Sequence, residues 1–440
     1  MSKPAGAALV LRMFSSAVIN QALLSAASLL VGLILIRRTA DQQYGYYILA
    51  VNALLLMTSL QSAFFAPSLV NRITHLDRRG RSDTVGGLYR AQRHMLGLAA
   101  AAAAALAAVL WGAGMLAAGP AILAIGVVGA SLATLNREYF RMTLLAYRRP
   151  EDVLRCDAAY VALLVAGALL ATLAPFPALW AVIGLAGAAL VGALLLSRAL
   201  QRHEAWNPAG APGILREIAP FGFWSTAGAA VHWTFSQGYS FLVAATLDVS
   251  AVAAVAATRL LMMPVNLLSS GLSTLMLPMA SGWLAAHGAP TVLRRLLLFA
   301  GGVAGAALCY FALLWLCRDW IFAHLLKKTF ANRDMLLQLW CGAFLLMIMR
   351  DQLLYLLVVR SRFRTLTAIT SASAVVSLLV SFWAMRRFGE IGAPLGVLVG
   401  EFLSALGIVV ESLREARQRG AAATAPQPGP GNALAPAAQG

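Results

Sequence analysis

Four arginines lie inside long apolar stretches of this sequence: Arg137 and Arg141 in one stretch, Arg259 and Arg350 in two others. A guanidinium group can bind a phosphate through two parallel hydrogen bonds, so each is a candidate anion-binding group. Arg259 is the most isolated, because the nearest acidic residue, Asp248, is eleven positions back. A buried charge is costly without a partner or water. We therefore expect Arg259 to face a water-filled cavity; the alternative is an ion pair with a carboxylate of another helix.

Three carboxylates occupy similar apolar surroundings. Glu138 is three residues before Arg141, a spacing that lets the two side chains pair on one helical face. Asp351 follows Arg350 directly, and adjacent helical residues point about 100° apart, so we expect no pair between them. Glu401 stands alone in its stretch. Its structural role would be to neutralise either Arg350 or the isolated arginine named above.

Uncharged polar residues are scattered through the same stretches. Their side chains most commonly form hydrogen bonds between helices, and a histidine can also exchange a proton near neutral pH. Asp157 is expected to pair locally, with Arg155 or with the turn at Arg148-Arg149. The polar candidates for a cavity wall are Asn20, Gln21, Asn52, His232 and Gln237.

The elements that carry these residues follow from the composition. Sixty percent of the residues are hydrophobic, 12% are charged and the mean hydropathy is +0.77, whereas soluble domains carry about 25% charged residues. This excludes a soluble globular enzyme, and the chain is too hydrophobic to be disordered. The net charge of +17 comes mainly from basic residues in short loops between apolar runs, a pattern typical of membrane topology and not of nucleic-acid binding. The sequence predicts an all-α, polytopic integral membrane protein.

Apolar runs of about 20 residues predict twelve transmembrane helices, separated by turns rich in proline, glycine and charge. The first is a span and not a cleaved signal peptide, because its 24 uncharged residues end at Arg37-Arg38 without a cleavage site. The eighth is overlong and contains Pro264 and Pro278, so we expect a kink or an end near Pro278. The predicted helices are 14–36, 44–66, 92–112, 120–146, 153–174, 178–200, 218–245, 250–281, 293–317, 335–358, 365–385 and 391–411.

Two glycine patterns predict close helix packing. Gly392, Gly396 and Gly400 recur every fourth residue in the last helix, and Gly301 and Gly305 do so in the ninth. Small residues at this spacing let helix backbones approach each other in a membrane. We expect both patterns to be packing faces and not ligand sites.

Basic residues are distributed unevenly over the predicted loops. With a cytoplasmic N-terminus, the segments on that side hold 22 arginines and lysines and the opposite side holds eight, so both termini are predicted to be cytoplasmic. The stretch around Asn207-Pro208 and Pro212-Gly213 divides the helices six and six. We expect an N-terminal half at 1–202, a cytoplasmic linker at 203–217, a C-terminal half at 218–412 and a disordered tail at 413–440.

Motifs for several other chemistries are missing from the sequence. It contains no GxxxxGK[ST] phosphate loop, no HExxH and no histidine or cysteine cluster with metal-ligand spacing, so no cofactor and no metal site is predicted. No stretch outside the apolar runs exceeds about 30 residues, which is too short for a soluble catalytic domain. The four cysteines, at 156, 309, 317 and 341, are expected to be small hydrophobic residues in the bilayer.

Local patterns also resemble a known family. Asn20-Gln21 precedes an apolar helix that ends at Arg37-Arg38, and Tyr44-Gly45-Tyr46-Tyr47 opens the next. In the eighth helix the pattern continues with Ala257-Thr258-Arg259-Leu260, Pro264 and Leu277-Pro278. Over roughly 10–412 the chain resembles the polysaccharide flippases, of O-antigen or exopolysaccharide type, in the multidrug/oligosaccharidyl-lipid/polysaccharide exporter superfamily, which are related to the lipid II flippases.

The resemblance implies a MATE-like fold and a transporter, not an enzyme. Such a flippase would move a polyprenyl-pyrophosphate-linked oligosaccharide across the inner membrane by alternating access, through a V-shaped cavity between the two halves. Membrane lipid, polysaccharide polymerase and export machinery are the implied partners. The expected pyrophosphate ligands are, in order, Arg259, Arg350, Arg137 and Arg141, and the expected cation-coupling residues are Glu401, Glu138 and Asp351.

Two other functions are compatible with the same sequence. A multidrug exporter of organic cations would share the fold, but a cation site favours carboxylates and aromatic rings over buried arginines. A membrane-embedded polymerase or ligase would act on the same lipid-linked sugars, but we would expect it to use a large periplasmic loop. The longest loop predicted on that side, at about 318–334, is short.

Overall fold

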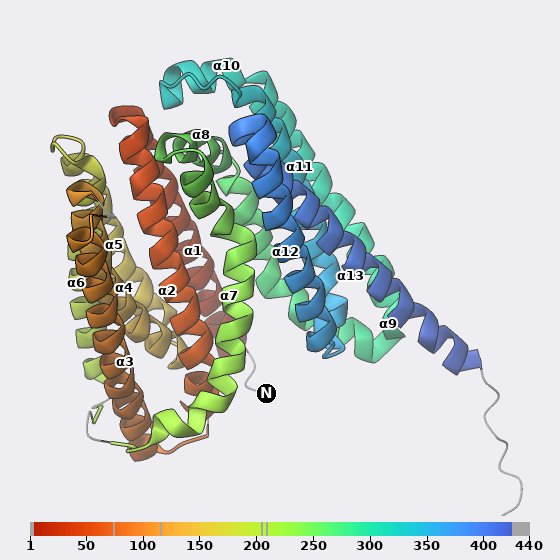
Figure 1. The fold of residues 1–440 in the computed structure, drawn as a ribbon. Helices are drawn as coiled ribbons and strands as arrows, with labels where there is room; N and C mark the ends of the chain where they lie inside the picture. Colours follow the sequence, from red (N-terminus) through yellow and green to blue (C-terminus); the bar gives the residue numbers. More distant parts are fainter. Residues whose placement is uncertain (1–3, 74, 115–116, 204–205, 208–209, 425–440) are drawn as a thin grey trace, which may run out of the picture.

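The computed structural model describes residues 4–73, 75–114, 117–203, 206–207 and 210–424, whose regular secondary structure is entirely helical (Figure 1). The all-α architecture predicted from the sequence is confirmed. The helices are α1 (Pro4–Arg38), α2 (Asp41–Ile73), α3 (Arg78–Gly112), α4 (Ala118–Ala146), α5 (Pro150–Ala171), α6 (Pro177–His203), α7 (Ile214–Thr246), α8 (Val249–Leu260), α9 (Met263–Leu316), α10 (Arg318–Trp320), the π-helix η1 (Ile321–Leu326), α11 (Arg333–Val359), α12 (Phe363–Phe388), the 3-10 helix η2 (Gly389–Ile391) and α13 (Gly392–Thr424).

Each predicted helix corresponds to an observed one, with one rearrangement. The predicted eighth helix is α8 together with the start of α9, and α9 also contains the ninth. A kink was expected there, and the axes of α8 and the first part of α9 differ by 52°. The cause is Pro264, whose ring nitrogen cannot donate to the carbonyl of Leu260. The expected end near Pro278 is wrong, because α9 continues to a break at Gly288, where φ is 77°, a value that glycine adopts without strain.

Three boundaries also differ from the expected ones. α3 begins at Arg78 and not at residue 92, because the Asp77 carboxylate caps it by accepting from the Gly80 amide at 2.8 Å. α7 begins at Ile214, inside the expected linker. α13 continues to Thr424, so the first part of the expected disordered tail is helical, and the rest lies outside the described residues.

The outer surface of the helices is apolar. Within the described ranges, nine helices are long and apolar enough to cross a membrane, and ten if the bent pair α8–α9 counts as a span. Leu98, Leu173 and Leu298 are 74%, 81% and 69% exposed. Exposing so large an apolar surface to water would be unfavourable, whereas the lipid tails of a membrane can cover it. The chain is therefore a multi-pass membrane protein.

Close helix packing follows one of the two glycine patterns. A Cβ at Gly396 would lie 2.0 Å from the Ser381 hydroxyl oxygen, so α12 and α13 touch almost backbone to backbone, as predicted. The pattern at Gly301 and Gly305 is not a packing face, because a Cβ at either position would meet no described atom within 4 Å. Glycine permits close approach, but only the neighbouring helix decides whether the space is used.

The helices α1–α6 meet α7–α13 most tightly near the turn between α1 and α2. α2 packs along α7 and α8, and α1 reaches α8, α9 and η1. A Cβ at Gly45 would lie 2.0 Å from the carbonyl oxygen of Val249, so only glycine fits between α2 and α8. At the other end, the axes of α12 and α13 diverge from α2 and α3 (Figure 1). At that end α7 still packs against α2, where a Cβ at Gly222 would lie 2.7 Å from the Phe64 ring, so only α12 and α13 splay away from the first group.

Candidate functional site

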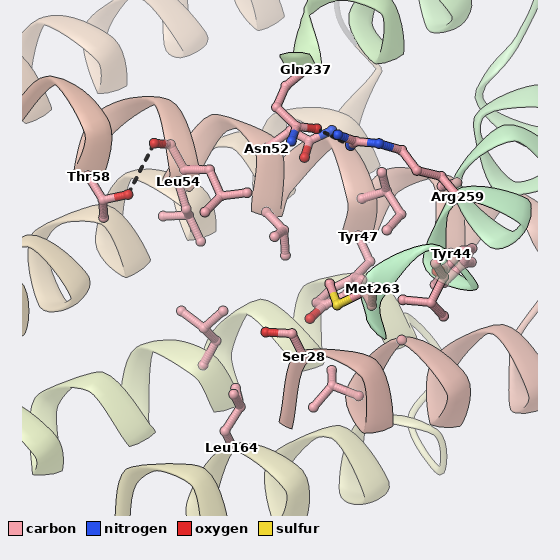
Figure 2. Close-up of a pocket in the computed structure, with 18 of the residues that line it drawn as sticks. Ser28, Tyr44, Tyr47, Asn52, Leu54, Thr58, Leu164, Gln237, Arg259 and Met263 are labelled. Carbon is pink, nitrogen blue, oxygen red and sulfur yellow. Dashed lines mark hydrogen bonds between the residues drawn. The ribbon is translucent and has the colours of Figure 1, made fainter. Parts of the chain in front are cut away.

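A cavity of about 370 Å³ lies where α1, α2 and α5 face α7 and α8 (Figure 2). We call it the Arg259 cavity, because Arg259 is its one charged lining residue among those the structure describes. A second space of about 400 Å³, the Arg137 cavity, shares Ser28 and Tyr160 with it and reaches Arg137 and Glu138. The two spaces are therefore adjacent. The polar residues of the Arg259 cavity are Ser28, Tyr44, Tyr47, Asn52, Thr58, Thr134, Tyr160, Gln237, Tyr239, Arg259 and Asn266.

Arg259 is the penultimate residue of α8 and is half-buried. Its Nη1 donates to Gln237 Oε1 at 2.6 Å and its Nη2 to the Ser236 carbonyl at 3.2 Å. The rings of Tyr239 and Trp340 each lie 5.5 Å from the guanidinium carbon, close enough for cation–π attraction. All these neighbours are neutral, and Arg259 forms no ion pair within the part of the chain described. The cavity therefore holds a positive charge that no carboxylate offsets.

Three buried polar groups in this wall lack hydrogen-bond partners among the described residues, and one of them is the Thr134 hydroxyl. The other two are Nε of Arg259 and the hydroxyl of Tyr44. A buried donor left without an acceptor costs about 1–3 kcal/mol. The wall is therefore short of acceptors, which an anion would supply.

A chain of hydrogen bonds between uncharged groups holds Gln237, the side chain that accepts from Arg259, in place. Asn52 on α2 donates its amide to the Ser240 hydroxyl at 2.8 Å, and Ser240 donates to the Gln237 carbonyl at 2.7 Å. In Figure 2, Asn52, Gln237 and Arg259 converge on one side of the cavity. The chain links α2 of the first group of helices to α7 of the second.

Arg137 and Arg141 are ion-paired around Asp157 on α5. The fully buried Asp157 carboxylate accepts from Arg137 at 2.5 Å, from Arg141 at 3.3 Å and from Asn20 at 2.8 Å. The expected local pairing of Asp157 is wrong, because its side chain points into the bundle toward α1 and α4. Glu138 and Arg141 pair at 3.0 Å, as their spacing predicted. Two positive and two negative charges cancel here.

A second network joins α11 to α13. Arg350 donates to Glu401 at 2.6 Å and to Asp351 at 2.8 Å, and the Ser269 hydroxyl lies 3.3 Å from the Asp351 carboxylate. The prediction that Arg350 and Asp351 do not pair is wrong, because the long arginine side chain curls back over its neighbour. The pairing of Glu401 with Arg350 is one of the two alternatives expected. One guanidinium between two carboxylates leaves a net negative charge.

The sequence-predicted residues are thus divided between cavity and framework. Arg259, Asn52 and Gln237 line the Arg259 cavity, and Arg137 and Glu138 line the Arg137 cavity. The other candidates line neither: Arg141, Arg350, Asp351 and Glu401 lie in ion-pair networks, Asn20 is bonded to Asp157, and the side chains of Gln21 and His232 are exposed.

Sequence reasoning missed the tyrosines of the wall and the central role of Asp157. One available signal was the repetition of an arginine–acid pair in the fourth helix of each half. Arg137 lies nine residues before the end of α4 at Ala146, and Arg350 nine before the end of α11 at Val359. A pair that is repeated at the same depth indicates an ion pair that holds helices together more than a ligand site.

A polar clasp joins the two groups of helices at their closed end. Lys328, just after η1, donates to the Asp41 carboxylate at 2.5 Å and to the Thr39 carbonyl at 2.9 Å. Asp41 begins α2, and Thr39 lies in the turn before it. This contact spans 287 positions in sequence, which is why no local pattern predicted it.

An apolar groove of about 290 Å³ runs between α1, α9 and η1. Leu260 lines both this groove and the Arg259 cavity. A Cβ at Gly32 on α1 would lie 3.0 Å from the Leu260 methyl groups, so only a thin wall separates the two spaces. The groove is lined by Leu29, Leu33, Leu260, Leu261, Pro264, Tyr310, Leu313, Leu314, Cys317, Trp320, Ile321 and Leu325.

Comparison with known proteins finds similarity in structure alone. No family model matches the sequence, and no curated protein matches it. An inward-facing structure of a multidrug resistance MATE family transporter of the MOP superfamily has a TM-score of 0.71 at 12% identity, covering 91% of this chain and 95% of that one. An outward-facing MATE structure scores 0.62 at 13% identity, covering 94% and 96%.

A flippase has the same architecture. The lipid II flippase MurJ, in an inward closed conformation, has a TM-score of 0.74 at 10% identity, covering 92% of this chain and 89% of MurJ. At such identities the likeness establishes the fold, and the MATE-like fold implied by the sequence resemblance is confirmed. The protein is a multi-pass membrane protein with the helical fold shared by MATE transporters and MurJ.

Proposed function

We propose that this protein is an inner-membrane flippase that carries a polyprenyl-pyrophosphate-linked oligosaccharide across the bilayer by alternating access. The observation that carries the proposal is Arg259, a guanidinium in a central cavity with neutral neighbours and an unpartnered Nε. A pyrophosphate would supply the missing acceptors and the opposite charge, and guanidinium groups bind phosphate through paired hydrogen bonds.

The surroundings of Arg259 suit both parts of such a lipid. The two adjacent cavities offer hydroxyl and amide groups for sugars, including Ser28, Asn52 and Thr58. The apolar groove on the other side of Leu260 offers a path for the prenyl chain. A headgroup bound at Arg259 could thus keep its tail in an apolar environment, which avoids the cost of exposing it to water.

The conformation supports an inward-open resting state. The clasp at Lys328 and the contact at Gly45 close the end that we propose to be outside, and α12 and α13 splay away from α2 and α3 at the opposite end. The TM-score against the inward-facing MATE structure is 0.71, compared with 0.62 against the outward-facing one. In this proposal both termini are cytoplasmic, and polymerase and export machinery receive the product outside.

Coupling to a cation gradient is proposed for the acidic residues predicted from the sequence. The α11–α13 network, with Glu401 and Asp351 around Arg350, has an excess negative charge that a proton or a monovalent cation would neutralise. Glu138 is paired with Arg141 but also faces the Arg137 cavity. Arg350, Arg137 and Arg141 are paired with carboxylates of neighbouring helices or turns of their own helix. Arg259 is therefore the primary pyrophosphate ligand in this proposal.

The alternatives fit the site less well. An exporter of organic cations would use the tyrosines of the cavity, but Arg259 would repel its substrate there. A polymerase or ligase would need catalytic groups beside the acceptor sugar. In the described lining of the Arg259 cavity there is no carboxylate and no histidine, so the usual general bases are missing from this wall.

Purified protein in liposomes distinguishes these functions. The probes are a fluorescent polyprenyl-pyrophosphate-linked monosaccharide and the organic cation ethidium, and a membrane-impermeant quencher reports lipid arrival in the outer leaflet. We expect the lipid probe to cross and ethidium to stay. Ethidium efflux without lipid movement would identify a multidrug exporter, and joined sugar units would identify a polymerase or ligase.

The clasp at Lys328 is predicted to hold the outer end closed. Reversing the charge in Asp41→Lys should weaken it by about 1 kcal/mol, the upper range for a partly exposed pair, and so raise the outward-open population about fivefold. The measurement is the labelling rate of a cysteine at Ser28 by an impermeant maleimide added outside, in a chain whose native cysteines are replaced by alanine. The double variant Asp41→Lys/Lys328→Asp should return to the parental rate; equal rates in all three chains would show that the clasp does not gate the cavity.

A further inference from the structure

The direction of α8 determines where the Arg259 guanidinium lies, because Arg259 is in its last turn. The start of α8 is fixed by the contact between Gly45 and the Val249 carbonyl. Its middle is fixed by Trp340, whose indole Nε1 donates to the Val255 carbonyl at 3.2 Å. Its end meets the 52° break before α9, where the regular backbone hydrogen bonds of a helix are interrupted. Something must therefore hold that end.

The break leaves a buried carbonyl without its regular donor. In a continuous helix the Val265 amide would donate to the Leu261 carbonyl, but here it donates to Met262 at 3.1 Å. Leu261 is only 6% exposed, so water cannot replace the lost bond. The hydroxyl of Tyr310 donates to the Leu261 carbonyl at 2.7 Å. This bond ties the break to the far half of α9, beyond Gly288.

We infer that Tyr310 is a positioning residue for Arg259: its hydroxyl fixes the α8–α9 break and so aims the last turn of α8 into the cavity. The inference rests on the proposed function, because it concerns the geometry of the pyrophosphate ligand. Tyr310 lies in the apolar groove on the other side of Leu260 and does not line the Arg259 cavity. It acts on the anion only through the backbone.

The test compares two probes that differ only in the pyrophosphate. Binding of farnesyl pyrophosphate and of farnesol to the full-length chain in detergent is measured by calorimetry. Tyr310→Phe keeps the ring in the groove but removes the hydroxyl, so the preference for the pyrophosphate should fall about tenfold while farnesol binding stays unchanged. Pro264→Ala, which can repair the helical ladder at the break, should lower the same preference by a different route.

The control is Tyr46→Phe, because the Tyr46 hydroxyl makes no hydrogen bond to any described residue and Tyr46 lies outside the cavity lining. Tyr46→Phe should bind both probes as the parent does. If Tyr310→Phe weakens both probes equally, Tyr310 only stabilises the bundle and the inference is overturned. It is also overturned if Arg259→Gln removes the pyrophosphate preference but Tyr310→Phe preserves it. If Arg259→Gln preserves the preference, the proposed function itself fails.

Discussion

Replacing Arg259 by glutamine is expected to reduce transport of the fluorescent lipid probe at least about 30-fold, with the protein still folded. Loss of one partner from a buried, hydrogen-bonded charge pair costs about 2–5 kcal/mol, and about 1.4 kcal/mol corresponds to tenfold in affinity. Glutamine can still donate a hydrogen bond to the side-chain oxygen of Gln237, which accepts from Arg259 at 2.6 Å. The local hydrogen bonding is therefore partly kept. The measurement is the initial rate of probe arrival in the outer leaflet of proteoliposomes.

Two further variants show whether charge or shape is responsible. Arg259→Lys keeps the charge but loses the planar fork that matches a phosphate, so we expect an intermediate rate. Arg386→Gln is the matched control, since Arg386 also lies over a ring, 4.2 Å from that of Phe382, but is exposed at the end of α12. Full transport by Arg259→Gln, or an equal loss in Arg386→Gln, would remove Arg259 from the mechanism.

The helical architecture was predictable because membrane spans are marked by composition. A run of about 20 apolar residues leaves few alternatives to a transmembrane helix. Each of the twelve predicted helices has a helical counterpart, and nine or ten of the described helices are long and apolar enough to cross a membrane. The kink at Pro264 was predictable for a similar reason, since proline removes a particular hydrogen bond. The continuation of α9 past Pro278 was not predictable, because a proline can either end a helix or lie within a continuing one.

The role of each buried charge was not predictable, because it depends on contacts between distant segments. Arg259 and Arg350 both lie in apolar stretches, but only Arg350 pairs with carboxylates: the adjacent Asp351 and Glu401, which is 51 positions away on α13. Arg137 meets Asp157 on the next helix, where the sequence suggested only local pairing. A helix can turn any face toward the bundle, so sequence places a charge at a depth but not against a partner.

The largest effect on stability is expected at Asp157. Asp157→Asn keeps the shape of the side chain but removes the charge that neutralises Arg137 and Arg141, whose side chains are 6% and 19% exposed. Leaving a buried charge without its partner costs about 3–5 kcal/mol. The amide would also turn a donor toward guanidinium groups that can only donate. We expect a markedly lower unfolding temperature in detergent, measured by fluorescence or by aggregation on heating.

Asp152→Asn provides the control on the same helix. Asp152 pairs with Arg155 at 3.9 Å and with His203 at 2.9 Å, and the Arg155 side chain is 77% exposed, so its loss should cost at most about 1 kcal/mol. A compensating variant separates charge from packing: Asp157→Leu with Arg137→Met removes both partners and should recover part of the stability, because Arg141 keeps Glu138. If Asp157→Asn unfolds at the parental temperature, the network is not the framework of α1, α4 and α5. Its arginines would then be free to act on substrate, and Arg137, which already faces a cavity, would become a second anion ligand.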